Sequence, residues 1–270
     1  MIDYHGRFVW YELMTTDVAA AKAFYAKVIG WGTKEVASPG RPHTLFTVRG
    51  ALAGGVTGLP EDARKTGVPP MWVGYVGVGD VDTTVTRIKR LGGAVHVPPT
   101  NISDMSRFSV VSHPQMALLA VLTWLKPGQH RHAALNEQRR VGWHELLAAD
   151  AETALSFYGE IFNWRKVEAD PGPLTSYRLF SVGGQTIGGM LTKPPLVHVA
   201  HWLYYFNVGD IDAASERVRS GGGQVLGGPV EVPPGNWIAR CVDPQGAVFA
   251  LEGGRRHGGA VGYFAARSNG

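Results

Sequence analysis

The chain has 270 residues, which suits two domains of ordinary size better than one small core. Apolar residues make up 44% of the composition and charged residues 18%, a globular mixture that excludes wholesale disorder. The net charge of +4 comes from 26 basic and 22 acidic residues, and the basic residues occur in short pairs, which is too thin a pattern for binding nucleic acid.

The predicted elements of the first half begin with a strand over Phe8–Thr15, where the side chains alternate. Asp17 is placed to cap a helix over Val18–Ile29, and Gly30 ends it. A later helix over Val81–Leu91 is capped by Asp80 or Asp82. The other predicted strands are Thr33–Ala37, His43–Arg49, Leu52–Val56, Met71–Val78, Ala94–Val97, Arg107–Val111 and Ala117–Thr123.

The second half of the chain repeats the first. W143-H-E-L-L-A-A-D150 echoes W10-Y-E-L-M-T-T-D17, and D243-P-Q-G-A-V-F-A-L251 echoes H113-P-Q-M-A-L-L-A-V121. Its helices are predicted over Ala151–Phe162 and Ile211–Ser220, so each half holds two βαβββ units. We expect an α+β fold with a domain at 1–126, a polar linker at 127–140, a second domain at 141–254 and a tail at 255–270.

The order of these units resembles the vicinal oxygen chelate superfamily, which includes glyoxalases, bleomycin-resistance proteins and extradiol dioxygenases. The resemblance rests on the D-x-x-x-A-x-x-F-Y helix of each half and on the D-P-Q-G-A-V-F-A-L turn, and it covers nearly all of both halves. It implies that the two units of each half pair edge to edge and curl into an open cup that holds a ligand. The chain is therefore expected to have two cups.

The resemblance also implies where catalytic members of the superfamily hold a divalent metal in the cup. Counting from the capping aspartates and the final turn gives six positions, occupied here by Trp10, Val73, Ala120, Trp143, Leu203 and Ala250. Indole and aliphatic groups have no lone pair to give to a metal ion. A shift of one residue brings in His144 but no second ligand, and it turns the side chain to the other face of the strand. We expect no metal cofactor.

A tryptophan in place of a metal ligand gives the cup a flat aromatic wall, which favours planar, partly apolar ligands. Strand alternation puts Glu12 and Glu145 on the same face as these tryptophans. Each glutamate is a candidate general acid or base, and a structural carboxylate is an equally open interpretation. The predicted ligand-binding residues, which include one in a loop near the cup mouth, are Trp10, Trp143, Tyr75, Tyr205, Asn207, Ala120, Ala250 and Trp237.

Other conspicuous residues are expected to be structural. Trp72 and Trp202 alternate towards the core, and His144 is favoured as a buried, hydrogen-bonded histidine. The pairs Gly54-Gly55 and Gly188-Gly189 lie in strands with no following helix, so they indicate close backbone approach rather than a phosphate cradle. The single cysteine, Cys241, cannot form an intrachain disulfide and is predicted to be an inert core residue.

Two functions remain open at this stage. The first is a metal-independent protein that binds and sequesters a planar aromatic compound, as the bleomycin-resistance relatives do. The second is a cofactor-independent enzyme of secondary metabolism in which Glu145 or Glu12 moves a proton. A metal-dependent glyoxalase or dioxygenase is disfavoured, and a protein-binding module with filled cups is a further alternative.

The expected partner is thus an aromatic small molecule, with no nucleic acid and no membrane. The sequence also leaves a homodimer open. The first residues lack a basic-then-apolar signal pattern, and no apolar run approaches the ~18 residues of a membrane span. We expect a cytoplasmic protein.

Overall fold

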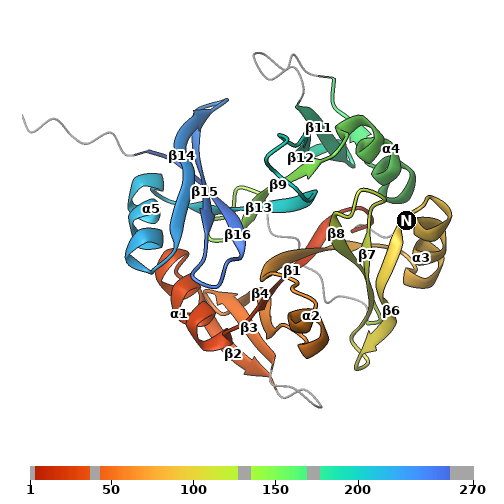
Figure 1. Cartoon of the computed structure of the whole chain (residues 1–270), viewed down its shortest axis with the longest axis horizontal. Helices are drawn as coiled ribbons and strands as arrows, with labels where there is room; N and C mark the ends of the chain where they lie inside the picture. The colour runs from red at the N-terminus through yellow and green to blue at the C-terminus, as the bar shows by residue number, and fades with distance from the viewer. Residues whose placement is uncertain (1–3, 37–42, 127–134, 169–176, 256–270) are drawn as a thin grey trace, which may run out of the picture.

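The computed structural model describes residues 4–36, 43–126, 135–168 and 177–255, and these form two eight-stranded mixed sheets, one from each half of the chain (Figure 1). Neither sheet closes into a barrel. Most of the predicted linker and nearly all of the predicted tail lie outside the described residues. No helix in the described ranges is long and apolar enough to cross a membrane.

The first sheet has the strand order β2-β3-β4-β1-β5-β8-β7-β6, in which the two βαβββ units meet at an antiparallel pair, β1 and β5. The short helix α2 was not predicted. The elements of this half are β1 Phe8–Thr15, α1 Val18–Val28, β2 Gly32–Val36, β3 His43–Val48, β4 Ala51–Gly58, α2 Glu61–Lys65, β5 Met71–Gly77, α3 Val81–Arg90, β6 Ala94–Ile102, β7 Ser106–Ser112 and β8 Leu118–Trp124.

The second sheet has the matching order β10-β11-β12-β9-β13-β16-β15-β14, so the edge-to-edge pairing of units within each half is confirmed. Both helices of this half have the predicted bounds. Its elements are β9 Val141–Ala148, α4 Ala151–Phe162, β10 Arg165–Lys166, β11 Arg178–Val182, β12 Gln185–Thr192, β13 His201–Val208, α5 Ile211–Ser220, β14 Gln224–Val232, β15 Asn236–Val242 and β16 Val248–Gly253.

One capping interaction starts the main helix of all four units. Each helix is preceded by an aspartate in extended conformation, whose side chain accepts a hydrogen bond from the backbone N–H three residues later. In the second unit the cap is Asp80, because Asp82 instead pairs with Arg107. The four caps are Asp17, Asp80, Asp150 and Asp210.

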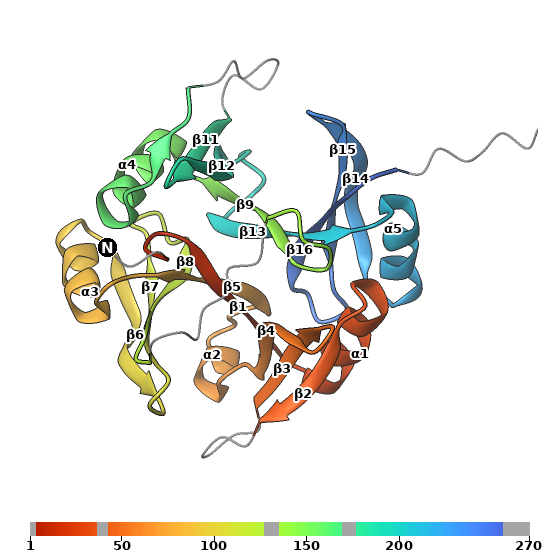
Figure 2. The same cartoon turned by 180° about the vertical axis from the view of Figure 1, so that it is seen from behind.

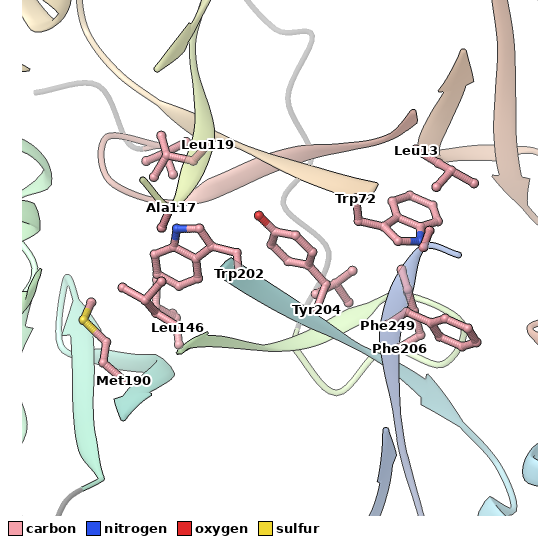
Figure 3. Close-up of a cluster of buried hydrophobic side chains, with 14 of the residues drawn as sticks. Leu13, Trp72, Ala117, Leu119, Leu146, Met190, Trp202, Tyr204, Phe206 and Phe249 are labelled. Atoms are coloured by element: carbon pink, nitrogen blue, oxygen red, sulfur yellow. The ribbon is translucent and has the colours of Figure 1, made fainter. Parts of the chain in front are cut away.

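The two sheets pack back to back, with their concave faces pointing away from each other (Figure 2). Large side chains from the central strands of both sheets fill the space between them, among them Trp72 and Trp202, which are 4% and 6% exposed (Figure 3). The prediction that these two tryptophans belong to the core is confirmed. Helices of the two halves also meet: α1 lies against α5, and α3 lies against α4.

At the centre of this interface, the Tyr11 hydroxyl and the His144 Nε2 atom lie 2.6 Å apart. His144 Nδ1 lies 2.6 Å from the carbonyl oxygen of Ile187, and a carbonyl can only accept, so Nδ1 carries the proton. Nε2 is then the acceptor, and Tyr11 donates to it. His144 is 2% exposed and stacks on Phe8, so the prediction of a buried, hydrogen-bonded histidine is confirmed.

Two further tryptophans tie each half to the strand that opens the other half. The Trp31 indole donates to the Arg139 carbonyl, just before β9, at 2.7 Å. The Trp164 indole donates to the Gly6 carbonyl, just before β1, at 2.6 Å. Burying these indoles with their N–H groups satisfied makes the halves one packed unit.

The turn before the last strand of each half is also part of the interface. Asp243 accepts from the backbone N–H groups of Gln245 and Ala247 and from the Tyr25 hydroxyl of the other half, at 3.1 Å for the hydroxyl. His113, at the matching place, accepts from the Gln115 N–H and packs against Phe157 of the other half. Both residues therefore stabilise the turn and its packing against the other half.

These buried histidines make stability depend on pH. Burial lowers the pKa of His144 to about 4 from an ordinary 6.5. The unfolded chain therefore takes up a proton as the pH falls below 6.5, while the folded chain does so only near 4, and stability is lost across that window. One pKa unit corresponds to ~1.4 kcal/mol, so the protonation of His144 alone should lower the unfolding free energy by about 3 kcal/mol as the pH falls through this window.

We expect the unfolding free energy from urea titration to fall between pH 7 and about pH 4.5. His113, whose pKa is also lowered to about 4 by burial, contributes in the same direction. The variant His144→Gln should be less stable than the parent at pH 7, but its unfolding free energy should fall less than that of the parent on acidification. An equal loss in both proteins would show that His144 is not the group responsible.

Candidate functional site

The concave face of the first sheet, here called the domain 1 cup, collects four of the predicted site residues. Trp10 and Glu12 alternate onto it from β1. Tyr75 on β5 pairs with Trp10, and Ala120 on β8 pairs with Tyr75. The strand register therefore brings residues from three strands together side by side.

The domain 2 cup is built from the matching strands of the second sheet. Tyr205 on β13 pairs with Trp143 on β9, and Ala250 on β16 pairs with Tyr205. Glu145 follows Trp143 on the same face. Tyr205 and Ala250 form a small apolar cluster with Leu147 and Leu203, and Trp143 packs against it.

In the domain 1 cup, Glu12 is 6% exposed and is held by two partners. The Trp10 indole donates to Oε2 at 3.0 Å, and His43 Nε2 lies 2.8 Å from Oε1. The hydrogen bond to this carboxylate raises the pKa of His43, although partial burial opposes the shift. The sequence analysis missed His43, which lies on β3 and faces the same side as Glu12.

In the domain 2 cup, Glu145 is 5% exposed and has different partners. Tyr177 accepts from the Trp143 indole at 2.9 Å and donates to Glu145 Oε2 at 3.2 Å. The Arg240 guanidinium donates to Oε1 at 2.8 Å. Burial and the nearby carboxylate raise the pKa of Tyr177, so its hydroxyl keeps its proton.

Tyr177 and Arg240 were also missed by the sequence analysis. Tyr177 lies three residues before Phe180, as His43 lies three before Phe46, and the two phenylalanines pair with the matching glycines Gly188 and Gly54. Aligning the halves through these strands would have pointed to Tyr177. Arg240 has Val110 as its counterpart, so no repeat signal marks it.

The glycine pairs make room for both cups. A Cβ on Gly54 would lie 2.8 Å from the Tyr11 carbonyl oxygen, and one on Gly188 would lie 2.2 Å from that of His144. The second glycine of each pair faces the cup, where a Cβ on Gly55 would meet Glu12 and one on Gly189 would meet the Tyr177 ring. The prediction of close backbone approach is confirmed.

The deepest positions of both cups are covered by these aromatic and polar side chains. Val73, Ala120, Leu203 and Ala250 are at most 3% exposed. The side chains that remain partly exposed at the opening are Trp10, His43, Tyr75, Trp143, Tyr177 and Arg240. A ligand would therefore lie against this outer layer rather than on the floor of the sheet.

Comparison with known proteins agrees with this architecture. Residues 7–120 and 140–251 match the sequence model of the Glyoxalase/Bleomycin resistance protein/Dioxygenase superfamily. The chain belongs to this superfamily. The Mn(II)-bound glyoxalase from Novosphingobium aromaticivorans has the same fold, with a TM-score of 0.63 at 16% identity, over 94% of this chain and 83% of that one.

Relatives of this chain include a protein named as a glyoxylase and proteins named for anthracycline biosynthesis. CFP32 of Mycobacterium tuberculosis, named a putative glyoxylase, is 34% identical over 246 residues, which are 90% of this chain and 92% of CFP32. The anthracycline biosynthesis protein DnrV of Streptomyces peucetius is 28% identical over 258 residues, which are 91% of this chain and 92% of DnrV.

Two predicted site residues lie outside the cups. The Asn207 amide donates to the carbonyls of Leu135 and Glu137 at 2.6 and 2.9 Å, so it holds the chain that leads into β9. Trp237 was expected at the cup mouth, but it points to the face opposite Arg240, because alternate residues of β15 face opposite sides. There it packs against Arg255, 4.3 Å from the ring centroid.

The metal chemistry of the superfamily does not fit the residues of this chain. The six positions where the resemblance places metal ligands hold only indole and aliphatic groups. Within the described ranges, no three His, Cys, Asp or Glu side chains come together as a metal-binding group. The thiolate of a cysteine could also bind a metal, but Cys241 is fully buried in the core. Burial raises its pKa to about 12, so it stays a thiol.

A surface groove of about 890 Å³ lies apart from both cups, between α1 and α2. Its charged residues are largely paired with each other, with Lys22 on Glu35 and Lys65 on Glu61. The groove therefore offers little unsatisfied charge to a ligand.

We expect the purified protein to hold no stoichiometric divalent metal. Treatment with EDTA should leave the melting temperature unchanged, because residues 4–36, 43–126, 135–168 and 177–255 form no ligand set from which an ion could be removed. Elemental analysis by mass spectrometry and a thermal melt with and without EDTA test this. One equivalent of bound metal that EDTA removes with a fall in melting temperature would contradict it.

Proposed function

We propose that the protein binds a planar aromatic small molecule in its cups without using a divalent metal. The observation that supports this most directly is the fixed tryptophan at each opening. Trp10 and Trp143 are partly exposed, and each indole N–H is already bonded within the cup. The ring is thereby held in one orientation before a ligand arrives, which lowers the entropy cost of stacking.

The polar groups beneath the rings favour binding over chemistry in the domain 2 cup. Both oxygens of Glu145 already accept hydrogen bonds, from Tyr177 and from Arg240. These two bonds hold the carboxylate in one orientation, so Glu145 is suited to orient the group above it. Sequestration of an aromatic compound is the simplest function for such a cup.

The relatives support the same class of ligand. Two proteins similar to this chain along most of its length are named anthracycline biosynthesis proteins, and anthracyclines carry a planar polycyclic ring system. A compound of that shape matches an indole wall above an apolar cluster. We therefore propose a polycyclic aromatic ligand.

A second candidate, an enzyme of secondary metabolism, is favoured by the domain 1 cup. There the carboxylate of Glu12 holds His43 at 2.8 Å, and the His43 side chain is 34% exposed. A histidine oriented by a buried carboxylate is a common general base. In this alternative His43 transfers the proton and Glu12 positions it, whereas the sequence analysis assigned the transfer to a glutamate.

The test is a thermal-shift screen with anthraquinones and naphthoquinones, followed by titration of tryptophan fluorescence. Trp143→Ala should weaken the binding of a ligand in the domain 2 cup by about tenfold, which is ~1.4 kcal/mol, because the stacking surface is lost. Trp237→Ala is the matched control, since this tryptophan lies outside the cup, and it should leave affinity unchanged.

The same hits separate binding from catalysis. With sequestration, Glu145→Gln and His43→Gln change affinity only, and the ligand is recovered unaltered. If His43→Gln abolishes conversion of the ligand while its affinity persists, the enzymatic alternative is correct. A screen without any planar aromatic hit, or equal effects of Trp143→Ala and Trp237→Ala, would overturn the binding proposal.

A further inference from the structure

The two cups share one electrostatic arrangement built from different residues. In each, a buried glutamate forms an ion pair with a basic side chain that is more exposed than the glutamate. The side-chain exposures are 8% for Glu12 and 34% for His43, and 6% for Glu145 and 42% for Arg240. The basic group is thus the more accessible member of each pair at the opening.

The basic residue belongs to the first unit of the sheet in one half and to the second unit in the other. His43 lies on β3 in the first unit of domain 1, while Arg240 lies on β15 in the second unit of domain 2. The position matching Arg240 is Val110, which pairs with Ala120 as Arg240 pairs with Ala250. The position matching His43 is Tyr177. The repeat therefore does not explain the shared arrangement, since each half places its base on a different strand.

The order of the charges determines which ligand groups are attracted. A ligand at the opening meets the basic side chain first, and the carboxylate lies behind it. Arg240 has five N–H donors in total; one bonds Glu145 and the guanidinium also interacts with Tyr205, which leaves further donors for an oxygen of a ligand. Hydrogen bonds from a guanidinium to an anionic oxygen are roughly twice as strong as neutral ones.

We propose that each cup selects an aromatic ligand that carries an anionic oxygen, such as a carboxylate or phenolate, with Arg240 binding it at all physiological pH values and His43 binding it only when protonated. This inference rests on the proposed function, because it names the group that accompanies the aromatic ring. Under this inference the affinity of the domain 2 cup for the anion does not change with pH, whereas that of the domain 1 cup does.

The surroundings of His43 are consistent with a charge that depends on pH. Glu12 on β1 contacts it, Glu35 on β2 lies near it, and Tyr75 on β5 faces the same carboxylate. The hydrogen bond to Glu12 raises the pKa of His43 from its ordinary 6.5, although partial burial opposes the shift, and this favours the charged form beside the carboxylate. Arg240 faces Glu145 and Tyr205 and is charged throughout.

The experiment uses 2-naphthoate and its neutral analogue 2-naphthamide, titrated into the full chain by isothermal calorimetry at about pH 6 and about pH 8.5. The carboxylate of naphthoate is ionised at both values. We expect two sites for naphthoate at the lower pH and one at the higher pH. Naphthamide should bind about tenfold more weakly, with no dependence on pH.

Variants assign each site to its cup. Arg240→Met should remove the site that persists at the higher pH, and Arg240→Lys should retain most of it. His43→Gln keeps a hydrogen-bonding group beside Glu12 without the charge, and it should remove only the site that depends on pH. Arg87→Met is the control, because this arginine pairs with Glu160 on an exposed surface.

The outcomes distinguish this inference from the proposed function. If naphthamide binds as tightly as naphthoate at both pH values, aromatic binding stands and the charge selection is wrong. If the number of naphthoate sites does not change with pH, or if Arg240→Met binds like the parent, the assignment of the two cups is wrong. If neither compound binds, the proposed function itself fails.

Discussion

The fold and the site both depend on the hydrogen bond between Tyr11 and His144 at the centre of the molecule. These two residues face each other across the interface between the sheets, 2.6 Å apart, at equivalent places on β1 and β9. Side chains alternate along a strand, so fixing one residue towards the interface fixes its neighbours towards the cup. Trp10 and Glu12, and likewise Trp143 and Glu145, therefore have no other face to occupy.

The interface also explains how two similar halves can differ. Gly74 in one half faces Tyr204 in the other, and the Tyr204 hydroxyl accepts from the Gly74 N–H at 2.8 Å. A Cβ on Gly74 would lie 2.6 Å from that hydroxyl, so a side chain at this position would displace the tyrosine. Equivalent positions must take complementary rather than identical residues where they meet, as Tyr11 and His144 also do. Divergence of the halves is in part a packing requirement.

The resemblance places the metal ligands of other superfamily members at positions that hold indole and aliphatic groups in these cups. With indole and aliphatic groups at those positions, the buried carboxylates need partners of another kind, since an unpaired buried charge is costly. His43 supplies that partner in one cup, and Arg240 together with Tyr177 supplies it in the other. The second glycine of each pair leaves room for these side chains. The result is an aromatic and polar layer where relatives can hold an ion.

The sequence by itself determined the repeat, the four capped helices and the faces of Trp10, Trp72 and His144, because these follow from local periodicity and capping. The pairing of units within each half was implied by the resemblance to the superfamily. Only the tertiary structure decided what Glu12 and Glu145 contact. Their partners are His43 on β3, Tyr177 just before β11 and Arg240 on β15, which are 31, 32 and 95 residues away in the chain. The placement of Asn207 likewise depends on the chain that leads into β9, to which its side chain bonds. The placement of Trp237 depends on the face of β15 to which its side chain points. Alternation along a strand reports the face of a residue but not its neighbours, which are set by how the strands are ordered and how the sheet curls.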